Sequence, residues 1–313
     1  MKYLVTGGAG FIGSHIVHKL LKQGESVCVL DNFSTGKREN IEDLARQFNG
    51  DRFEVIEGDL RDAARVEEAI RGVEVIFHEA AFVSVPQSME EPQTCFDVNI
   101  TGTSRLLDRA RAAGVRRVVL ASSAAVYGEA DAFPLVEETL PQPLTPYAVS
   151  KRVKEMYAEL FTGSFGLEVV ALRYFNVYGP RQRPDSMYAA AVPIFARRLL
   201  DGKPVTVYGD GGQSRDLINV RDVVRANIIA SEHAGAPGRI FNICTGIETR
   251  LLDLLDIMYE LIPNVPPPQF DAPRAGDLYR SVGSPQKARD ILGFHAEVSL
   301  VDGLKETIDW MRA

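Results

Sequence analysis

A tyrosine and a lysine four residues apart form a pair that could carry out acid-base chemistry in this 313-residue sequence. Tyr147 and Lys151 lie in 145-TPYAVSKRVKE-155, where a proline precedes the tyrosine as it often does at the start of a helix. A spacing of four residues places both side chains on one helical face, where an ammonium can lie beside a phenol. The same pair also occurs by chance, with an exposed lysine and a tyrosine that only packs, so other parts of the chain must decide between the two interpretations.

The N-terminal segment has the pattern of a dinucleotide-binding turn. An apolar strand, 3-YLVT-6, runs directly into 7-GGAGFIG-13, and an amphipathic helix follows. Small residues let the backbone approach a pyrophosphate, and a helix N-terminus offers free N–H groups and the positive end of the helix dipole. The spacing of Gly7, Gly10 and Gly13 departs from G-x-G-x-x-G, and a tight turn without a ligand could also carry glycines. The strand before the loop and the helix after it favour a cofactor site.

The next predicted strand ends in Asp31, near the distance at which an acidic residue meets the adenosine ribose of a dinucleotide. A carboxylate accepts hydrogen bonds from a free 2'-hydroxyl and repels a 2'-phosphate. Asp31 therefore favours NAD over NADP. Lys37 and Arg38 follow closely and would suit a phosphate, so they weaken this preference.

Two serines stand at the end of the strand predicted at 117-RVVLAS-122. Ligands of a doubly wound sheet bind at the carboxyl ends of its strands, so Ser122 and Ser123 are expected beside the cofactor. A serine hydroxyl can bind the reacting oxygen. A phenol can take up a proton when a neighbouring ammonium and a nicotinamide cation stabilise its phenolate. Ser123, Tyr147 and Lys151 are therefore the predicted catalytic residues of a redox reaction.

Short runs rich in valine, isoleucine and leucine alternate with helical patterns in the first half of the chain. The expected strands are 3–6, 26–30, 53–57, 74–78, 117–122 and 168–173, and the expected helices are 11–24, 62–72, 92–114 and 146–166. Further helical patterns lie at 187–202, 221–235, 250–262, 284–294 and 299–313. This alternation predicts an α/β fold with a doubly wound parallel (Rossmann) sheet. We expect residues 1–175 to form it, residues 176–313 to form mainly a smaller α/β domain, and residues 217–236 to return to the first domain.

Composition makes several classes of function improbable. The chain is 45% hydrophobic and 25% charged, its formal net charge is -7, and it has no run of lysine and arginine that would suit a nucleic acid. No stretch approaches the roughly 18 apolar residues of a membrane span, and no signal peptide is recognisable, so a cytoplasmic protein is expected. The three cysteines and five histidines lack metal-ligand spacing, and no metal is expected.

Short motifs with characteristic residues occur along almost the whole chain. They are TGGAGFIGSH at 6–15, DN at 31–32, GDLRD at 58–62, HEAA at 78–81, NITGT at 99–103, SSAAVYG at 122–128, YAVSK at 147–151, RYFNVYGPRQ at 173–182 and RDLINVRDVV at 215–224. Together they resemble the nucleotide-sugar branch of the extended short-chain dehydrogenase/reductase family. The resemblance implies an NAD-binding Rossmann domain, a smaller domain for a UDP-sugar, and a homodimer formed through a four-helix bundle. Helices near 92–113 and 146–164 would supply that bundle.

The resemblance also implies which residues bind the ligands. Those expected at NAD are Gly7, Gly10, Phe11, Ile12, Gly13, Asp31, Asn32, Gly36, Asp59, Leu60, Ala80, Ala81, Asn99, Ser122, Tyr147, Lys151 and Tyr174. Those expected at the nucleotide sugar are Ser123, Asn176, Ala190, Val192, Val207, Tyr208, Arg215, Arg274, Asp277 and Ser281. In the resembling enzymes the two arginines bind the pyrophosphate and the aspartate binds the ribose. Uracil is the base that the resemblance implies, but no residue distinguishes it from thymine or guanine.

The two residues after the catalytic serine indicate the reaction. Members of this branch remove a hydride from carbon 4 of a nucleotide-bound hexose. The 4,6-dehydratases then use Asp and Glu at these two positions, and the decarboxylases have Glu at the second, whereas this chain has Ala124 and Ala125. The site therefore resembles that of the 4-epimerases, in which a 4-keto sugar rotates and takes the hydride back on its other face. Tyr147 would accept and return the 4-hydroxyl proton, Lys151 would support it and bind the cofactor ribose, and NAD would stay tightly bound and be recycled.

Ser281 occupies a position at which 4-epimerases restricted to plain hexoses tend to have tyrosine and those accepting N-acetylhexosamines a small residue. The space predicts interconversion of UDP-N-acetylglucosamine and UDP-N-acetylgalactosamine, with UDP-glucose and UDP-galactose also accepted. Two alternatives stay open. Arg183 and Arg280 could bind a carboxylate, as in UDP-glucuronate 4-epimerisation. A non-catalytic NAD-binding sensor of the same fold is also conceivable, but the intact catalytic set argues against it.

Overall fold

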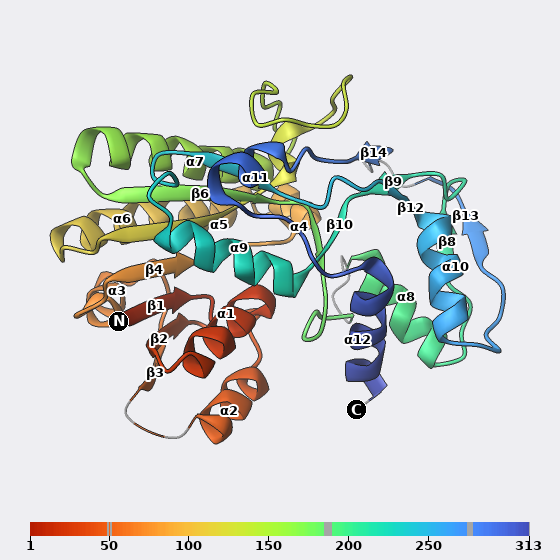
Figure 1. Ribbon diagram of the computed structural model, residues 1–313, viewed down its shortest axis with the longest axis horizontal. Helices are drawn as coiled ribbons and strands as arrows, with labels where there is room; N and C mark the ends of the chain where they lie inside the picture. Colours follow the sequence, from red (N-terminus) through yellow and green to blue (C-terminus); the bar gives the residue numbers. More distant parts are fainter. Residues whose placement is uncertain (49, 51, 185–189, 274–277, 313) are drawn as a thin grey trace.

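The computed structural model describes residues 1–48, 50, 52–184, 190–273 and 278–312, and a seven-stranded parallel sheet lies at its centre (Figure 1). The strand order is β11-β6-β5-β4-β1-β2-β3. The strands are β1 (Lys2–Thr6), β2 (Ser26–Asp31), β3 (Phe53–Glu57), β4 (Val75–His78), β5 (Arg117–Ser123), β6 (Glu168–Tyr174) and β11 (Ile240–Ile243). The order reverses between β1 and β4, and such a switch point is where doubly wound sheets bind ligands. The predicted Rossmann fold is confirmed.

Sequence reasoning predicted six of these strands and missed the seventh, β11. This strand pairs in parallel with β6, from Ile240 opposite Ala171 to Ile243 opposite Tyr174. Its run IFNI is short and contains an asparagine, so its pattern does not distinguish it from a loop. Asn242 is buried, and its polar side chain is satisfied there. It accepts a hydrogen bond from the Tyr127 hydroxyl at 2.7 Å and donates to the carbonyl of Leu135 at 3.0 Å.

Helices cover both faces of the sheet. One face packs against α1 (Phe11–Lys22), α2 (Arg38–Gln47), α9 (Val220–Glu232) and α11 (Gln286–Leu292). The other packs against α3 (Ala63–Ile70), α6 (Thr103–Ala112) and α7 (Pro146–Phe165). Alternate strand residues supply the two apolar clusters, so that Phe77 of β4 lies in the first and Ile76 in the second. Burial on both faces explains why the strands are almost continuously apolar.

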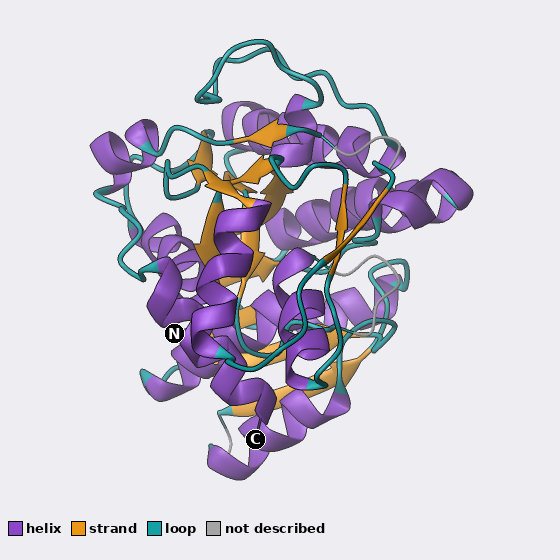
Figure 2. Ribbon diagram, turned by 90° about the vertical axis from the view of Figure 1, so that its right-hand side faces the viewer, coloured by secondary structure: helices purple, strands orange, loops and turns teal. Residues whose placement is uncertain are grey.

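A smaller unit lies on the right of Figure 1, and Figure 2 turns it toward the viewer. Its core joins α8 (Ala191–Leu200), α10 (Leu251–Leu261) and α12 (Leu300–Arg312). Its short strands are β7 (Asn176–Tyr178) paired with β10 (Leu217–Asn219), β8 (Thr206–Tyr208) paired with β13 (Gln269–Asp271), and β9 (Ser214–Arg215) between β12 (Thr249–Arg250) and β14 (Arg280–Ser281). The chain crosses between the units repeatedly, because α9, β11 and α11 pack into the Rossmann unit.

Two helices were not predicted, and one predicted helix is composite. The low apolar content of α2 hid it, since only Ile41 and Leu44 are buried apolar residues there, and α4 (Val85–Glu90) has six residues. The predicted helix at 92–114 consists of α5 (Pro92–Phe96), the π-helical turn η1 (Asp97–Gly102) and α6. None of the helices in the described ranges could serve as an apolar membrane span.

The helix that carries Tyr147 and Lys151 has a defined start and end. The Thr145 side chain accepts a hydrogen bond from the backbone N–H of Ala148 at 3.2 Å, and Pro146 occupies the first turn. At the other end Gly166 adopts a left-handed conformation with φ of 71°. The cap therefore fixes where α7 begins, one residue before the tyrosine.

Replacing the cap residue should weaken this helix start. Thr145→Ala leaves the Ala148 N–H without its acceptor and should lower the free energy of unfolding by about 1 kcal/mol. Thr145→Ser keeps the hydroxyl and should stay close to the wild type. Urea unfolding followed by circular dichroism measures both variants, and equal losses in the two would show that the threonine methyl group, not the cap, matters.

Candidate active site

The glycine loop between β1 and α1 leaves no room for larger side chains. Gly7 has φ of 71°, and a Cβ there would lie 2.6 Å from the backbone nitrogen of Ala80. A Cβ at Gly13 would lie 2.2 Å from the carbonyl oxygen of Gly7. Gly10 is the N-cap of α1 and provides no side chain to satisfy the free N–H groups of the first turn. The loop thus fits a pyrophosphate held by backbone N–H groups and by the helix dipole.

Asp31 is fixed at the carboxyl end of β2. Its two oxygens accept hydrogen bonds from the backbone N–H groups of Ala9 at 2.9 Å and Phe33 at 2.8 Å, and burial raises the pKa of its carboxyl. Gly36 is required nearby, because a Cβ there would lie 3.0 Å from an oxygen of Asp31. Arg38, one of the two basic residues that would suit a 2'-phosphate, forms an ion pair with Glu57 at 2.7 Å. This arrangement fits an adenosine ribose with free hydroxyls.

The residues expected near adenine form one connected group. Asn32 donates a hydrogen bond to Asp59 at 2.7 Å, and Arg61 contacts both oxygens of the same carboxylate at 2.9 Å. The hydrogen bond from Arg61 is the main reason why the pKa of Asp59 is lowered to about 2. Leu60 packs against Gly102 of η1, where a Cβ would lie 3.0 Å from the Cβ of Leu60.

Asn99 lies in the π-helical turn and ties two parts of the site together. Its side chain exchanges hydrogen bonds with the backbone of Phe82, at 2.8 Å and 3.1 Å, and donates to the Ser150 hydroxyl at 2.9 Å. Ser150 directly precedes Lys151, so Asn99 links the loop after β4 to α7. Irregular π-helical turns often lie at functional sites. Ala80 and Ala81, at the start of that loop, are both half-buried.

The predicted catalytic residues lie at the end of β5 and the start of α7, two elements that the side chain of Lys151 joins. Lys151 is 3% exposed, and its ammonium donates to the carbonyl of Ala121 at 2.9 Å. The same nitrogen lies 5.4 Å from the centre of the Tyr147 ring. Ser123 ends β5 and is half-buried, and its side-chain oxygen accepts a hydrogen bond from the backbone N–H of Ala125 at 3.2 Å. The arrangement places an ammonium beside a phenol, as the helical spacing predicts.

Ser122 faces away from Ser123 and lies in a buried polar cluster. Its hydroxyl donates to Glu155 at 2.7 Å, and Glu155 forms a buried ion pair with Arg173 at 2.6 Å. Side chains alternate across a strand, so two consecutive serines cannot face the same ligand. The Ser122 side chain therefore joins β5 to α7 instead of pointing into a cofactor site, and alternation in the sequence could have indicated this.

Ala124 and Ala125 open the short 3-10 helix η2 (Ala124–Tyr127) directly after Ser123, and both are half-buried. Neither residue supplies a carboxylate beside Ser123. On the neighbouring strand β6, Tyr174 lies directly beside Ser123 in the sheet register. The Tyr174 hydroxyl donates to Glu79 at 2.9 Å, which ties the end of β6 to the residue after β4.

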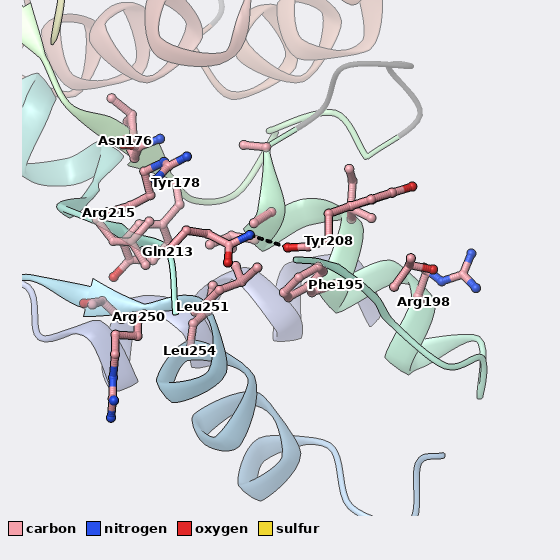
Figure 3. Close-up of a pocket in the computed structure, with 18 residues that line it drawn as sticks. Asn176, Tyr178, Phe195, Arg198, Tyr208, Gln213, Arg215, Arg250, Leu251 and Leu254 are labelled. Atoms are coloured by element: carbon pink, nitrogen blue, oxygen red, sulfur yellow. Dashed lines mark hydrogen bonds between the residues drawn. The ribbon is translucent and has the colours of Figure 1, made fainter. Parts of the chain in front are cut away.

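A cavity of about 450 Å³ lies in the smaller unit (Figure 3). Of the residues predicted at the nucleotide sugar, those that line it are Asn176, Ala190, Val192, Tyr208 and Arg215. Val207 does not line the cavity, because its side chain is fully buried in the core that α8 and α10 share.

Sequence reasoning missed several residues of the cavity wall. Gln213 donates to the carbonyl of Tyr208 at 2.7 Å, and Phe195 and Leu254 add apolar surface. Figure 3 shows that the guanidinium groups of Arg198 and Arg250 point away from the other labelled residues. No motif in the sequence marks Arg198, Arg250 or Leu254, because the walls come from segments that only the fold brings together.

Ser281 is 8% exposed and lies on β14, where it pairs with Arg215 of β9. This register places the predicted sugar-selecting residue beside the predicted phosphate-binding arginine. Arg280 is held by Glu248 through two contacts of 2.9 Å and 2.7 Å. The predicted ligand residues Arg274 and Asp277 lie outside the described residues.

Comparison with known proteins identifies the family. Residues 3–244 match the NAD dependent epimerase/dehydratase family. The chain is 39% identical to the UDP-glucose 4-epimerase of Mycolicibacterium smegmatis over 100% of this chain and 99% of that relative. Similar solved structures include the UDP-glucose 4-epimerase of Thermotoga maritima with UDP-glucose (TM-score 0.93, 39% identity, 100% and 99% of the two chains). Another is the UDP-N-acetylglucosamine 4-epimerase of Methanobrevibacter ruminantium (TM-score 0.94, 36% identity, 99% and 98%).

The Rossmann sheet, glycine loop and Ser/Tyr/Lys set define an extended short-chain dehydrogenase/reductase. The chain belongs to the NAD-dependent epimerase/dehydratase family, and its cofactor is NAD. Relatives described as a dTDP-glucose 4,6-dehydratase, a UDP-N-acetyl-alpha-D-glucosaminuronate decarboxylase and a probable UDP-glucuronate 4-epimerase also match over at least 99% of the chain. Family membership therefore leaves the reaction and the sugar to be argued from the site.

Adding one methyl group to the glycine loop should prevent the protein from binding its cofactor. Gly13→Ala puts a Cβ against the carbonyl of Gly7, so the variant should release almost no nicotinamide when the purified protein is denatured. Gly163→Ala in α7, where a Cβ meets nothing within 4 Å, is the matched control and should release as much as the wild type. Full retention of NAD by Gly13→Ala would contradict the assigned pyrophosphate site.

Proposed function

We propose that the protein is a UDP-sugar 4-epimerase that interconverts UDP-N-acetylglucosamine and UDP-N-acetylgalactosamine, and also UDP-glucose and UDP-galactose. The proposal rests on the combination of Ser123, Tyr147 and the buried Lys151 with two alanines, Ala124 and Ala125, directly after Ser123. This group can move a proton at a sugar hydroxyl, but it has no carboxylate to eliminate water or to assist a decarboxylation.

The chain's own residues divide the work of the reaction. Ser123 positions the oxygen on carbon 4 of the sugar through a hydrogen bond. Tyr147 accepts the proton of that hydroxyl and later returns it, while the adjacent Lys151 ammonium stabilises the phenolate form. A bound NAD would supply the acceptor for the hydride of carbon 4 and the donor for its return to the opposite face of the 4-keto sugar. Because the cycle has no net redox change, we propose that NAD stays tightly bound.

The cavity of the smaller unit is the proposed site of the nucleotide. Arg215 presents several N–H donors in a fixed plane, which suits a pyrophosphate. Phe195, Tyr208 and Leu254 form walls against which a flat base can pack. The Thermotoga maritima neighbour with UDP-glucose supports UDP as the nucleotide. Ser281 pairs with Arg215, and its small side chain is the basis for the proposed acceptance of a 2-acetamido group.

The sugar is the finer part of the proposal. The M. ruminantium neighbour, a UDP-N-acetylglucosamine 4-epimerase, supports the acetylated substrate, and the UDP-glucose 4-epimerases support the plain hexose. A UDP-glucuronic acid 4-epimerase from Bacillus cereus is also a neighbour. Arg280 and Arg183 are the two arginines that could bind the carboxylate of a uronate. Arg280 is already bound by Glu248, and Arg183 contacts the carbonyl of Thr35 at 3.4 Å, which argues against that alternative.

We also propose that two copies pair through the helices near 92–113 and 146–164. Met156, Leu160 and Phe165 of α7 are large apolar side chains that are between 46% and 53% exposed in the single chain. A second copy would bury them. A dimer in solution has about twice the 34.5 kDa mass of one chain, which analytical ultracentrifugation measures.

The function is tested with purified protein and no added NAD. UDP-N-acetylglucosamine, UDP-glucose and UDP-glucuronate are supplied separately, and proton NMR follows the anomeric signal of the 4-epimer. We expect epimers of the first two sugars. Tyr147→Phe should lose at least about a thousandfold in turnover, because proton transfer is blocked, yet still carry NAD. No epimer from any of the three sugars would contradict the proposed function, and a product from UDP-glucuronate alone would replace the proposed sugar.

Filling the space beside Arg215 tests the sugar assignment. Ser281→Tyr should lower kcat/KM for UDP-N-acetylglucosamine at least about tenfold and leave that for UDP-glucose nearly unchanged, because the ring competes with the acetamido group. Ser281→Ala keeps the space and should retain both activities. The assignment is wrong if Ser281→Tyr affects the two sugars equally.

A further inference from the structure

Glu79 is a carboxylic acid that the proposed reaction does not use. It directly follows His78, the last residue of β4, and its Oε1 accepts a hydrogen bond from the Tyr174 hydroxyl at 2.9 Å. The same hydroxyl accepts a hydrogen bond from the Asn227 side chain of α9 at 2.8 Å. The carboxyl is therefore held in place by contacts that join β4 to β6 and α9.

The position of Glu79 relates it to the cofactor site. Its backbone N–H donates to the carbonyl of Thr6 at 3.1 Å, and the next residue, Ala80, lies against Gly7 of the glycine loop. On the other side Tyr174 pairs in register with Ser123. Glu79 thus lies between the loop that holds the pyrophosphate and the catalytic serine, in the part of the site where the nicotinamide must lie to react.

The ionisable groups that face Glu79 come from three elements. They are Lys151 and Lys154 of α7 and Tyr174 of β6, and the third element is β4, whose His78 contacts Lys154 and not Glu79. The Lys154 ammonium is fully buried, 3.2 Å from Nε2 of His78 and 3.4 Å from the carbonyl of Ala80, and has no carboxylate within 4 Å in the described part of the chain.

The ionisation states of these groups depend on burial. Burial lowers the pKa of Lys154 and of His78, and it raises the pKa of the Glu79 carboxyl to about 7. The carboxyl consequently gains its charge as the pH rises through neutrality. A charge in this place is only weakly screened, because the surrounding side chains are buried.

We propose that the Glu79 carboxylate is an electrostatic element of the cofactor site, which stabilises the oxidised, positively charged nicotinamide over its neutral reduced form. The proposal rests on the NAD-dependent reaction proposed above, but not on the identity of the sugar. An epimerase that released its keto intermediate would be left with NADH and could not start a new cycle. A negative charge beside the ring favours the oxidised state from which each cycle begins.

The test measures the redox state of the bound cofactor. Holoprotein is equilibrated with a mediator dye of known potential, whose reduced form passes two electrons and one proton to NAD and releases its second proton. Absorbance at 340 nm then gives the ratio of bound NADH to NAD. At pH 8.5 Glu79→Gln should raise this ratio roughly tenfold over the wild type, because the amide keeps the hydrogen bond from Tyr174 and lacks the charge. At pH 5.5, where the wild-type carboxyl is protonated, the two ratios should agree.

The control is Glu74→Gln, an equal change of charge at an exposed residue directly before β4, which should leave the ratio unchanged. Equal ratios for wild type and Glu79→Gln at pH 8.5 would overturn the proposal. A difference of the same size at both pH values would also overturn it, since that would reflect packing and not charge. Should Glu79→Gln fail to fold, the wild type alone decides, because reduction of its bound NAD should take up more than one proton per two electrons near pH 7, the excess being the proton that Glu79 gains. Uptake of one proton at every pH would reject the proposal.

The outcome is separable from that of the proposed function. The redox measurement needs no sugar, so it can support the role of Glu79 even if none of the tested UDP-sugars is epimerised. Conversely, epimerisation with an unchanged redox ratio in Glu79→Gln would keep the function and reject the role of this carboxylate.

Discussion

The hydrogen bond from the Lys151 ammonium to the carbonyl of Ala121, 2.9 Å long, joins the first turns of α7 to the end of β5. A lysine that is 3% exposed is costly unless its charge is satisfied, and the strand carbonyl supplies that contact. The bond fixes the ammonium at 5.4 Å from the centre of the Tyr147 ring. Everything that the site does with protons depends on this placement.

Other buried polar groups hold the two elements in register. Glu155 lies one helical turn after Lys151, binds the Ser122 hydroxyl of β5, and forms an ion pair with Arg173 of β6. Asn99 links the loop after β4 to Ser150. Removing one partner of such a buried pair leaves an uncompensated charge, so these contacts specify one arrangement of strands and helix. Catalytic geometry and fold specificity therefore share the same residues.

Two parts of the structure could be predicted from the sequence: the regular alternation of strands and helices, and the glycine loop, whose local geometry is fixed. Continuous apolar runs predicted six strands, and the glycine loop with Asp31 predicted the cofactor site, because both signals are local. β11 was missed because its four residues become a strand only through pairing with β6. Ser122 was assigned to the cofactor because its position at a strand end was considered without side-chain alternation. Glu79 was passed over, since its significance lies in contacts with Tyr174 and Asn227 from distant segments.

Isotope labelling tests the central claim, transient oxidation at carbon 4, most directly. The protein is incubated in ordinary water with UDP-N-acetylglucosamine or UDP-glucose carrying deuterium at carbon 4, and the 4-epimer is analysed by NMR and mass spectrometry. We predict that the product keeps its deuterium, because the label leaves with the hydride and returns to the same carbon without exchanging with solvent. Loss of the label to water would show that carbon 4 gives up a proton, which would contradict the proposed chemistry of Tyr147, Lys151 and NAD.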